Sequence, residues 1–205
     1  KGLTADDVAT LAMILRTNRL PRLRELDLDS NELGDAGVQA LYEGLGRGCA
    51  PALRILYLPH NNIGPAGAEA LAAALRRGAM PNLIKLVLGA NPIGNQGVAA
   101  LATPLRKMPA LKELFLGNTE IGDEGVASLV NNLGKDDFQA LQELNLSDNN
   151  ITDAGMTTLV AAIDVGGLPK LRKCFLLPTD IDGSPPTSTA SASAVQAVKD
   201  ALAKR

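Results

Sequence analysis

The segment LRILYLPHNNIGPAG, residues 53–67, decides the fold, because variants of it recur along the chain. The variants are LRELDLDSNELGDAG at 23–37, LIKLVLGANPIGNQG at 83–97, LKELFLGNTEIGDEG at 111–125, LQELNLSDNNITDAG at 141–155 and a degenerate LRKCFLLPTDIDG at 171–183. Successive copies start 28 or 30 residues apart. A fixed spacing of this length is typical of proteins built from stacked repeats.

Each repeat is predicted to contain one strand and one helix. Leucines alternate with other residues at the start of each copy, as Leu56 and Leu58 do, which predicts a short strand with its leucines turned inward. The stretch GPAGAEALAAAL at 64–75 repeats apolar residues three or four positions apart, which predicts an amphipathic helix. One unit cannot offset the entropy of its residues, roughly 1–2 kcal/mol each, so units must stack. The sequence therefore predicts an α/β solenoid, a horseshoe with parallel β-strands on the concave face and α-helices on the convex face.

The full pattern LxxLxLxxNxIGxxGxxALAxAL at 53–75 resembles the ribonuclease-inhibitor-type subfamily of leucine-rich repeats. The resemblance covers residues 20–183. That subfamily includes ribonuclease inhibitor, the Ran GTPase-activating protein, the sensor regions of NLR immune receptors and tropomodulin-like actin regulators. The resemblance implies protein–protein recognition inside cells, so we expect a cytoplasmic protein-binding module.

The loops after the strands are predicted to be held by inward-turned side chains. The amides expected to bond unpaired loop backbone groups are those of Asn31, Asn61, Asn91 and Asn149. Thr119 and Thr179 fill the same slot in two copies, where a hydroxyl makes fewer bonds, so these loops should be less rigid. Glycine pairs such as Gly64 and Gly67 should allow a tight turn and close backbone approach rather than bind phosphate, because no Lys-Ser/Thr follows them.

We expect a single domain over residues 1–205. Residues 1–19 fit the helical half of a repeat, with Thr4 as candidate N-cap and with the apolar residues Val8, Leu11, Met13 and Leu15. Residues 20–183 hold about six repeats, 184–193 form a polar linker, and 194–205 form a capping helix with a stripe of Val195, Val198 and Leu202. Because the chain starts within a repeat, we allow for further repeats or another domain before it.

Composition argues against several classes of partner. The net charge is −2, from 20 Lys+Arg and 22 Asp+Glu, and two Tyr and three Phe are the only aromatic residues. A nucleic-acid partner is therefore not expected. No apolar run of about 18 residues is present and the first residues lack a basic leader, so neither a membrane partner nor a signal peptide is predicted. Oligomeric state is left open.

No catalytic, metal or cofactor site is predicted. The single histidine, His60, has no nucleophile and carboxylate that the sequence would pair with it, and we expect it in a solvated loop. Cys49 and Cys174 lack metal-site spacing and are expected to pack as reduced thiols. The acidic pairs Asp6–Asp7 and Asp136–Asp137 are expected to face solvent at helix starts or turns.

The candidate binding site consists of the outward strand positions, which the sheet should arrange in two rows. The first row is Glu25, Ile55, Lys85, Glu113, Glu143 and Lys173, and the second is Asp27, Tyr57, Val87, Phe115, Asn145 and Phe175. Four of the six second-row residues are apolar or aromatic, which is typical of a partner-binding stripe. The same residues could instead pack on one another as cross-strand neighbours.

The leading functional hypothesis is a scaffold or recognition module that binds one protein on the concave face, with Tyr57, Phe115 and Phe175 as anchors. Asp27, Asp29 and Glu32 make the N-terminal end of that face acidic, so a partner should present lysine or arginine there. The alternatives are a regulator of a small GTPase similar to the Ran GTPase-activating protein, and the repeat segment of a larger sensor or actin regulator.

Overall fold

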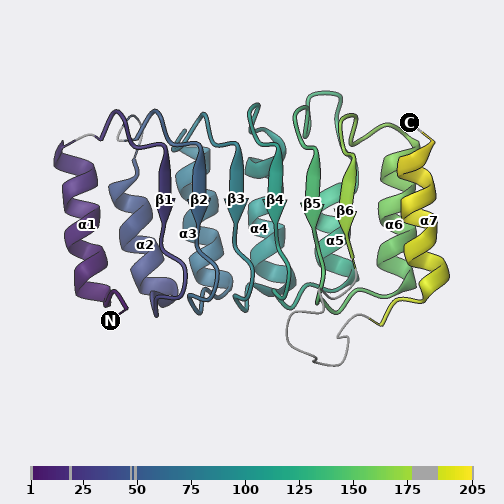
Figure 1. Ribbon diagram of the computed structural model, residues 1–205, viewed down its shortest axis with the longest axis horizontal. Coiled ribbons are helices and arrows are strands. Elements are labelled where there is room, and N and C mark those ends of the chain that lie inside the picture. Colours follow the sequence, from purple (N-terminus) through teal and green to yellow (C-terminus); the bar gives the residue numbers. More distant parts are fainter. Residues whose placement is uncertain (1, 19, 47, 49, 177–188, 205) are drawn as a thin grey trace.

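A computed structural model of the chain describes residues 2–18, 20–46, 48, 50–176 and 189–204. Strands and helices alternate, and the helices lie against one face of a single sheet (Figure 1). The strands are β1 (Glu25–Asp27), β2 (Ile55–Tyr57), β3 (Lys85–Val87), β4 (Glu113–Phe115), β5 (Glu143–Asn145) and β6 (Lys173–Phe175). The helices are α1 (Ala5–Asn18), α2 (Gly34–Gly44), α3 (Pro65–Arg76), α4 (Gly94–Arg106), α5 (Asp123–Val130), α6 (Asp153–Asp164) and α7 (Ala192–Ala203).

The six strands form one parallel sheet in sequence order. The register places equivalent positions of successive repeats side by side, in the row Leu26, Leu56, Leu86, Leu114, Leu144 and Cys174. Parallel neighbours need a crossover connection, and the helix between each pair of strands provides it. The predicted α/β solenoid with a parallel sheet is confirmed.

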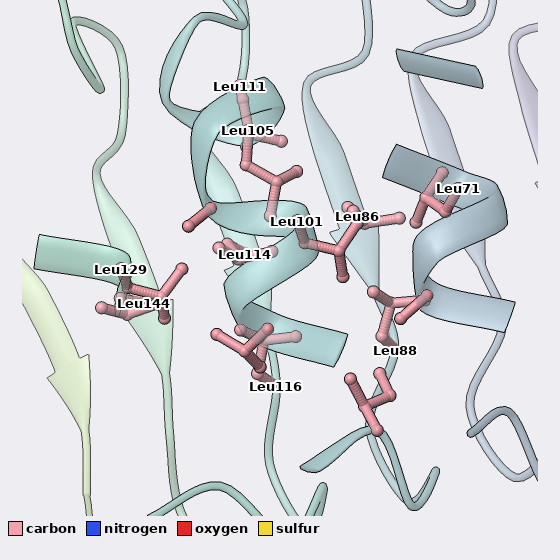
Figure 2. Packing of buried hydrophobic residues seen from close by; sticks show 14 of the residues in the cluster. Leu71, Leu86, Leu88, Leu101, Leu105, Leu111, Leu114, Leu116, Leu129 and Leu144 are labelled. Atoms are coloured by element: carbon pink, nitrogen blue, oxygen red, sulfur yellow. The ribbon is translucent and has the colours of Figure 1, made fainter. Parts of the chain in front are cut away.

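Leucines from both layers fill the space between the sheet and the helices (Figure 2). Leu86 and Leu114 come from the sheet and Leu101 from α4, and all three side chains are fully buried. Burial of each such side chain contributes about 1.5–3 kcal/mol. The helical periodicity read from the sequence therefore marks the face that packs on the sheet.

The loops are held by buried asparagines, as predicted. The Asn91 amide donates to the carbonyls of Leu58 and Leu88, each at 2.8 Å, and its oxygen accepts from the backbone N–H groups of Asn61 and Ile63, each at 2.9 Å. In the next repeat the Thr119 hydroxyl donates to one backbone carbonyl, at 2.8 Å. The smaller number of bonds is confirmed there, whereas Thr179 lies outside the described residues.

A second series of bonds joins the start of one helix to the start of the next. Asp35 in α2 accepts hydrogen bonds from the N–H groups of Gly64 and Gly67, at 2.7 and 2.9 Å. Asn95 bonds equivalent groups of the following repeat, and so does Asp123. These side chains satisfy helix-start donors that have no partner within their own helix.

The last helix is joined to the one before it by the same kind of hydrogen bond. Asp153 accepts from the backbone N–H of Ser191 at 2.6 Å and from its hydroxyl at 2.9 Å. The Ser191 hydroxyl also accepts from the backbone N–H of Ala194 and so caps α7. The helix expected from residue 194 thus begins two residues earlier, at Ala192, and Val195, Val198 and Ala201 are its buried residues.

The glycines of the helix starts permit close contact between repeats. A Cβ atom on Gly67 would lie 2.6 Å from an Asp35 carboxylate oxygen and 2.7 Å from a methyl carbon of Ile63. Such contacts are too short for any larger side chain, so the Asp35 bond requires glycine at this position.

Among the apolar residues of α1, Met13 lies outside the buried face, and its side chain is 53% exposed. The buried residues of this helix are Val8, Ala12 and Leu15, which follow the helical period that Met13 breaks. Thr4 does cap the helix, because its hydroxyl accepts from the Asp7 N–H while Asp7 accepts from the Thr4 N–H. The backbone N–H and the hydroxyl of Thr4 both donate to the Asp7 carboxylate and lower the pKa of Asp7.

The prediction of solvent exposure was wrong for Asp137, which is buried. Its carboxylate accepts from the Gly134 N–H at 2.9 Å and pairs with the Lys107 ammonium at 2.6 Å. Burial alone would raise the pKa of Asp137. The Lys107 ammonium and the Gly134 N–H lower it by more, so the pKa lies below its usual value. The neighbouring Phe138 enters the core and carries Asp137 inward.

Candidate protein-binding face

The first and third residues of each strand point away from the helices, while the middle residue points toward them. This arrangement defines the open sheet face, formed by Glu25, Asp27, Ile55, Tyr57, Lys85, Val87, Glu113, Phe115, Glu143, Asn145, Lys173 and Phe175. The register brings the two rows together as equivalent neighbours, with Tyr57 next to Val87 and Val87 next to Phe115. That the open sheet face binds a partner stays a prediction, which this geometry permits.

Lys85 occupies the centre of the open sheet face. Its ammonium lies 4.8 Å from the centre of the Phe115 ring and 5.6 Å from that of Tyr57, and it forms an ion pair with Glu113 at 3.0 Å. Partial burial lowers the pKa of Lys85, but the hydrogen bond and charge of Glu113, with a contribution from Tyr57, raise it more. Lys85 therefore covers part of the aromatic stripe with a charge that the chain itself supplies.

Charges in the C-terminal half of this face are also paired. The Lys173 ammonium donates to a Glu143 carboxylate oxygen at 2.6 Å. The Asn145 side-chain oxygen accepts from the N–H and the hydroxyl of Ser147, at 2.9 and 2.8 Å. The mixed signs of the first row thus form pairs across neighbouring strands.

Phe175 is the open aromatic side chain of this face, with 38% of its surface exposed. Tyr57 and Phe115 are half-buried and share contacts with Lys85. The middle of the aromatic stripe is therefore engaged in cross-strand packing, whereas Phe175 at its C-terminal end is exposed. Cys174 faces the core, and burial raises the pKa of its thiol to about 12, which makes it unreactive at neutral pH. Cys49 lies outside the described residues.

The N-terminal end of the face is acidic. Glu25, Asp27 and Asp29 are exposed, and within the described residues none of them pairs with a basic side chain. Asp27 accepts the Asp29 N–H at 2.9 Å, which fixes its carboxylate beside the end of β1. The face therefore changes from acidic at β1 to aromatic and paired charges toward β6.

Chemical groups for catalysis do not gather on this face. His60 is exposed in the loop after β2, as predicted, and its backbone N–H donates to the Gly89 carbonyl. Among the described residues no three His, Cys, Asp or Glu side chains lie close enough to hold a metal ion. The arrangement offers apolar contact and charge complementarity, which are the chemistry of binding.

A family model described as "Leucine Rich repeat" matches residues 20–41, 51–72, 79–102, 107–130 and 139–160, more than half of the chain. The chain belongs to the leucine-rich-repeat family. Its open sheet face is thus the strand face of a leucine-rich-repeat solenoid. The ribonuclease-inhibitor-type subclass stays a prediction, because the matching model does not specify it.

Two solved structures share the fold of this leucine-rich-repeat chain. The C-terminal domain of tropomodulin from Caenorhabditis elegans is 14% identical, with a TM-score of 0.57 and a match over 97% of this chain and 92% of that one. Actin-binding site 2 of leiomodin-1 is also 14% identical, with a TM-score of 0.57 and a match over 99% and 90%. At such identities the likeness shows the fold alone. No curated protein matches the sequence significantly.

The helices of the leucine-rich repeats are short. Within the described part of the chain, none has the length and apolar character that crossing a membrane requires.

Proposed function

We propose that this leucine-rich-repeat chain is an intracellular recognition or scaffold module that binds another protein on the open sheet face. The observation that supports the proposal is the face itself, on which six in-register strands present aromatic and charged side chains that are exposed or partly exposed. Such a mixture of apolar anchors and charged neighbours suits protein recognition. We propose binding rather than catalysis.

The exposures indicate how the partner would lie. Phe175 offers the most accessible aromatic surface, and Tyr57 adds an amphipathic ring near the acidic end. A partner group over β6 should therefore be apolar, while the part over β1 should carry lysine or arginine to meet Asp27. The two ends together would fix the direction of the partner along the solenoid.

The experiment is capture from a native lysate with immobilised wild-type protein and a Tyr57→Glu, Phe175→Glu variant. The matched control is Gln39→Glu, Gln96→Glu, which adds the same charge at exposed helix positions. Circular dichroism should show that all three proteins are folded. We expect the wild type and the control to retain a protein that the face variant releases. Equal capture by all three would contradict the proposal.

Actin is the first named candidate partner. It is proposed because both similar structures cover nearly the whole chain, and one of them bears the name of an actin-binding site. Co-sedimentation with filamentous actin, and the polymerisation rate of labelled monomeric actin, would test it with the same three proteins. An effect that the face variant lacks would support actin as the partner. If the wild-type protein neither sediments with actin filaments nor changes the polymerisation rate, actin is excluded as the partner, but other protein partners are not.

A further inference from the structure

Charges of opposite sign are separated onto the two long edges of the solenoid. The strand-end edge, residues 2–7, 28–37, 58–67, 88–97, 116–125 and 146–155, carries ten Asp and Glu and no Lys or Arg. This edge lies along the bottom of Figure 1. The strand-start edge, along the top, contains the ends of the helices and the turns that lead into the strands. Most of the arginines and lysines gather there, together with the acidic residues Asp136, Asp137 and Asp164.

Helix dipoles explain part of this separation, because acids favour helix starts and bases favour helix ends. Arg106 at the end of α4 donates to the carbonyls of Ser128 and Leu129, and Lys107 is paired with Asp137. Arg106 and Lys107 therefore bond other parts of the chain. A second group of basic residues lies beyond the helices, and its side chains make no such bonds within the described residues.

The second group consists of basic residues in the turns between helix and strand. They are Arg22, Arg24, Lys112, Lys170 and Arg172. All five are exposed, and within the described residues none of their side chains has an ion pair or a hydrogen bond. These cations lie in the first, fourth and sixth repeats and make a positive strip on a chain whose net charge is −2, whereas the equivalent Arg54 of the second repeat donates to the Asn82 carbonyl.

This strip continues directly into the open sheet face. Arg24, Lys112 and Arg172 each precede the first residue of a strand, β1, β4 and β6 respectively. A protein that rests on the strands would therefore pass over these cations. We propose that the strand-start edge binds an acidic segment of the protein partner that lies on the open sheet face. This inference rests on the proposed function.

A narrow acidic segment fits better than a broad polyanion. Within the described residues the carboxylates of Glu25, Asp27 and Asp29 have no basic partner, and they stand on the adjoining face, so a duplex nucleic acid or a membrane surface laid over this region would meet them as well. Screening limits the repulsion to about 8 Å at physiological salt, so a single extended segment along the edge meets it mainly beside Glu25, which follows Arg24.

The test uses a fluorescein-labelled 16-residue peptide of alternating Glu and Ala, with a Gln-Ala peptide as the uncharged comparison. Fluorescence anisotropy would be measured at 50 mM and 300 mM salt. We expect the Glu-Ala peptide to bind at low salt, and the Arg24→Gln, Lys112→Gln, Arg172→Gln variant to lose about 3- to 100-fold in affinity, the range for three exposed charge pairs.

The control variant is Gln39→Glu, Gln96→Glu, Gln196→Glu, which lowers the net charge by the same three units at exposed helix positions. It should bind the peptide nearly as wild type does. An equal loss in both variants would assign the effect to net charge and overturn the proposal. So would absence of binding at low salt.

Two further outcomes would assign the edge to another occupant and so overturn the proposal. One is binding of a 24-base-pair DNA duplex or of phosphatidylserine vesicles at 150 mM salt that the edge variant loses. The other is self-association, seen by sedimentation, that the edge variant abolishes. A Tyr57→Ser, Phe175→Ser variant keeps the net charge and should still bind the Glu-Ala peptide, so failure of the open sheet face and failure of the edge give different results.

Discussion

The ammonium of Lys85 lies 4.8 Å above the ring of Phe115, on the strand next to its own. With Tyr57 on the other side and Glu113 as its ion-pair partner, the cation joins three successive strands of the open sheet face. Tyr57 and Phe115, which belong to the aromatic stripe, are therefore already held by contacts within the chain.

The Lys85–Phe115 contact should stabilise the fold. A double-mutant cycle of Lys85→Met and Phe115→Leu, followed by urea unfolding, is expected to give a coupling free energy of about 0.5–1 kcal/mol, the range for a partly exposed cation–π pair. The same cycle with Lys85→Met and Ile55→Val provides a neighbour without a ring. Equal coupling in the two cycles would mean that the ring contributes nothing specific.

The Lys85 cluster should also weaken at alkaline pH. Since the folded-state pKa of Lys85 is raised, the contribution to stability is complete below the unfolded-state pKa of about 10.4 and is lost as pH rises through the folded-state value. The difference in melting temperature between wild type and Lys85→Met should therefore shrink between pH 8 and pH 11. A constant difference over this range would show that ionisation of Lys85 does not stabilise the fold.

The carboxylate of Asp35 should stabilise the junction between the first two repeats. Asp35→Ala removes the acceptor for Gly64 and Gly67 and is expected to lower the free energy of unfolding by about 1–2 kcal/mol. Asp35→Asn should cost less, because Asn95 bonds the equivalent groups two repeats later. Asp6→Ala, at an exposed helix start where no such bond exists, measures the dipole contribution alone.

Asparagine at position 119 should stabilise the fourth repeat. Thr119→Asn restores the bonds that Asn91 makes in its own loop and is expected to raise the free energy of unfolding by about 0.5–1.5 kcal/mol. Thr119→Ala, which removes the bond to Leu116, should lower it. A loss of stability in Thr119→Asn would show that the buried loop has no room for the amide.

Removal of the Tyr42 hydroxyl should stabilise the core. The ring is 1% exposed, and its hydroxyl has no hydrogen-bond partner within the described residues, so burial raises its pKa strongly. Tyr42→Phe keeps the packing and is expected to raise the free energy of unfolding by about 1 kcal/mol. Tyr42→Leu, which changes the shape as well, should lower it. Destabilisation in Tyr42→Phe would point to a water molecule bonded at this hydroxyl.

Periodicity was sufficient to predict the strands, their parallel order and the residues on each side of the sheet. Leu56 and Asn91 could be placed from the sequence because their positions recur in every repeat and the register of the stack follows from that recurrence. Asp137 was misplaced because the burial of Phe138 next to it is a tertiary effect that local charge pattern does not reveal.

Contacts between side chains of different repeats were the part that sequence reasoning missed. The Lys85 cluster could have been anticipated, because alignment of the repeats places a lysine between two aromatic residues and beside a glutamate. Asp35, Asn95, Asp123 and Asp153 also share one repeat position, directly after the glycine or threonine at the start of each helix. The binding face was located as a surface, but which of its groups are already occupied depends on rotamers and distances.

Pro65 occupies the repeat position that Asp35, Asn95, Asp123 and Asp153 occupy in the other repeats, but it has no side-chain acceptor to offer the start of α4. In a stack where each unit is coupled only to its neighbours, stability is a sum of nearest-neighbour terms. The junction between the second and third repeats lacks one term that the junctions around it possess. Packing of α3 against α4 and the bonds of Asn91 to Asn61 and Ile63 therefore hold this junction without the side-chain link at the helix start that the neighbouring junctions have.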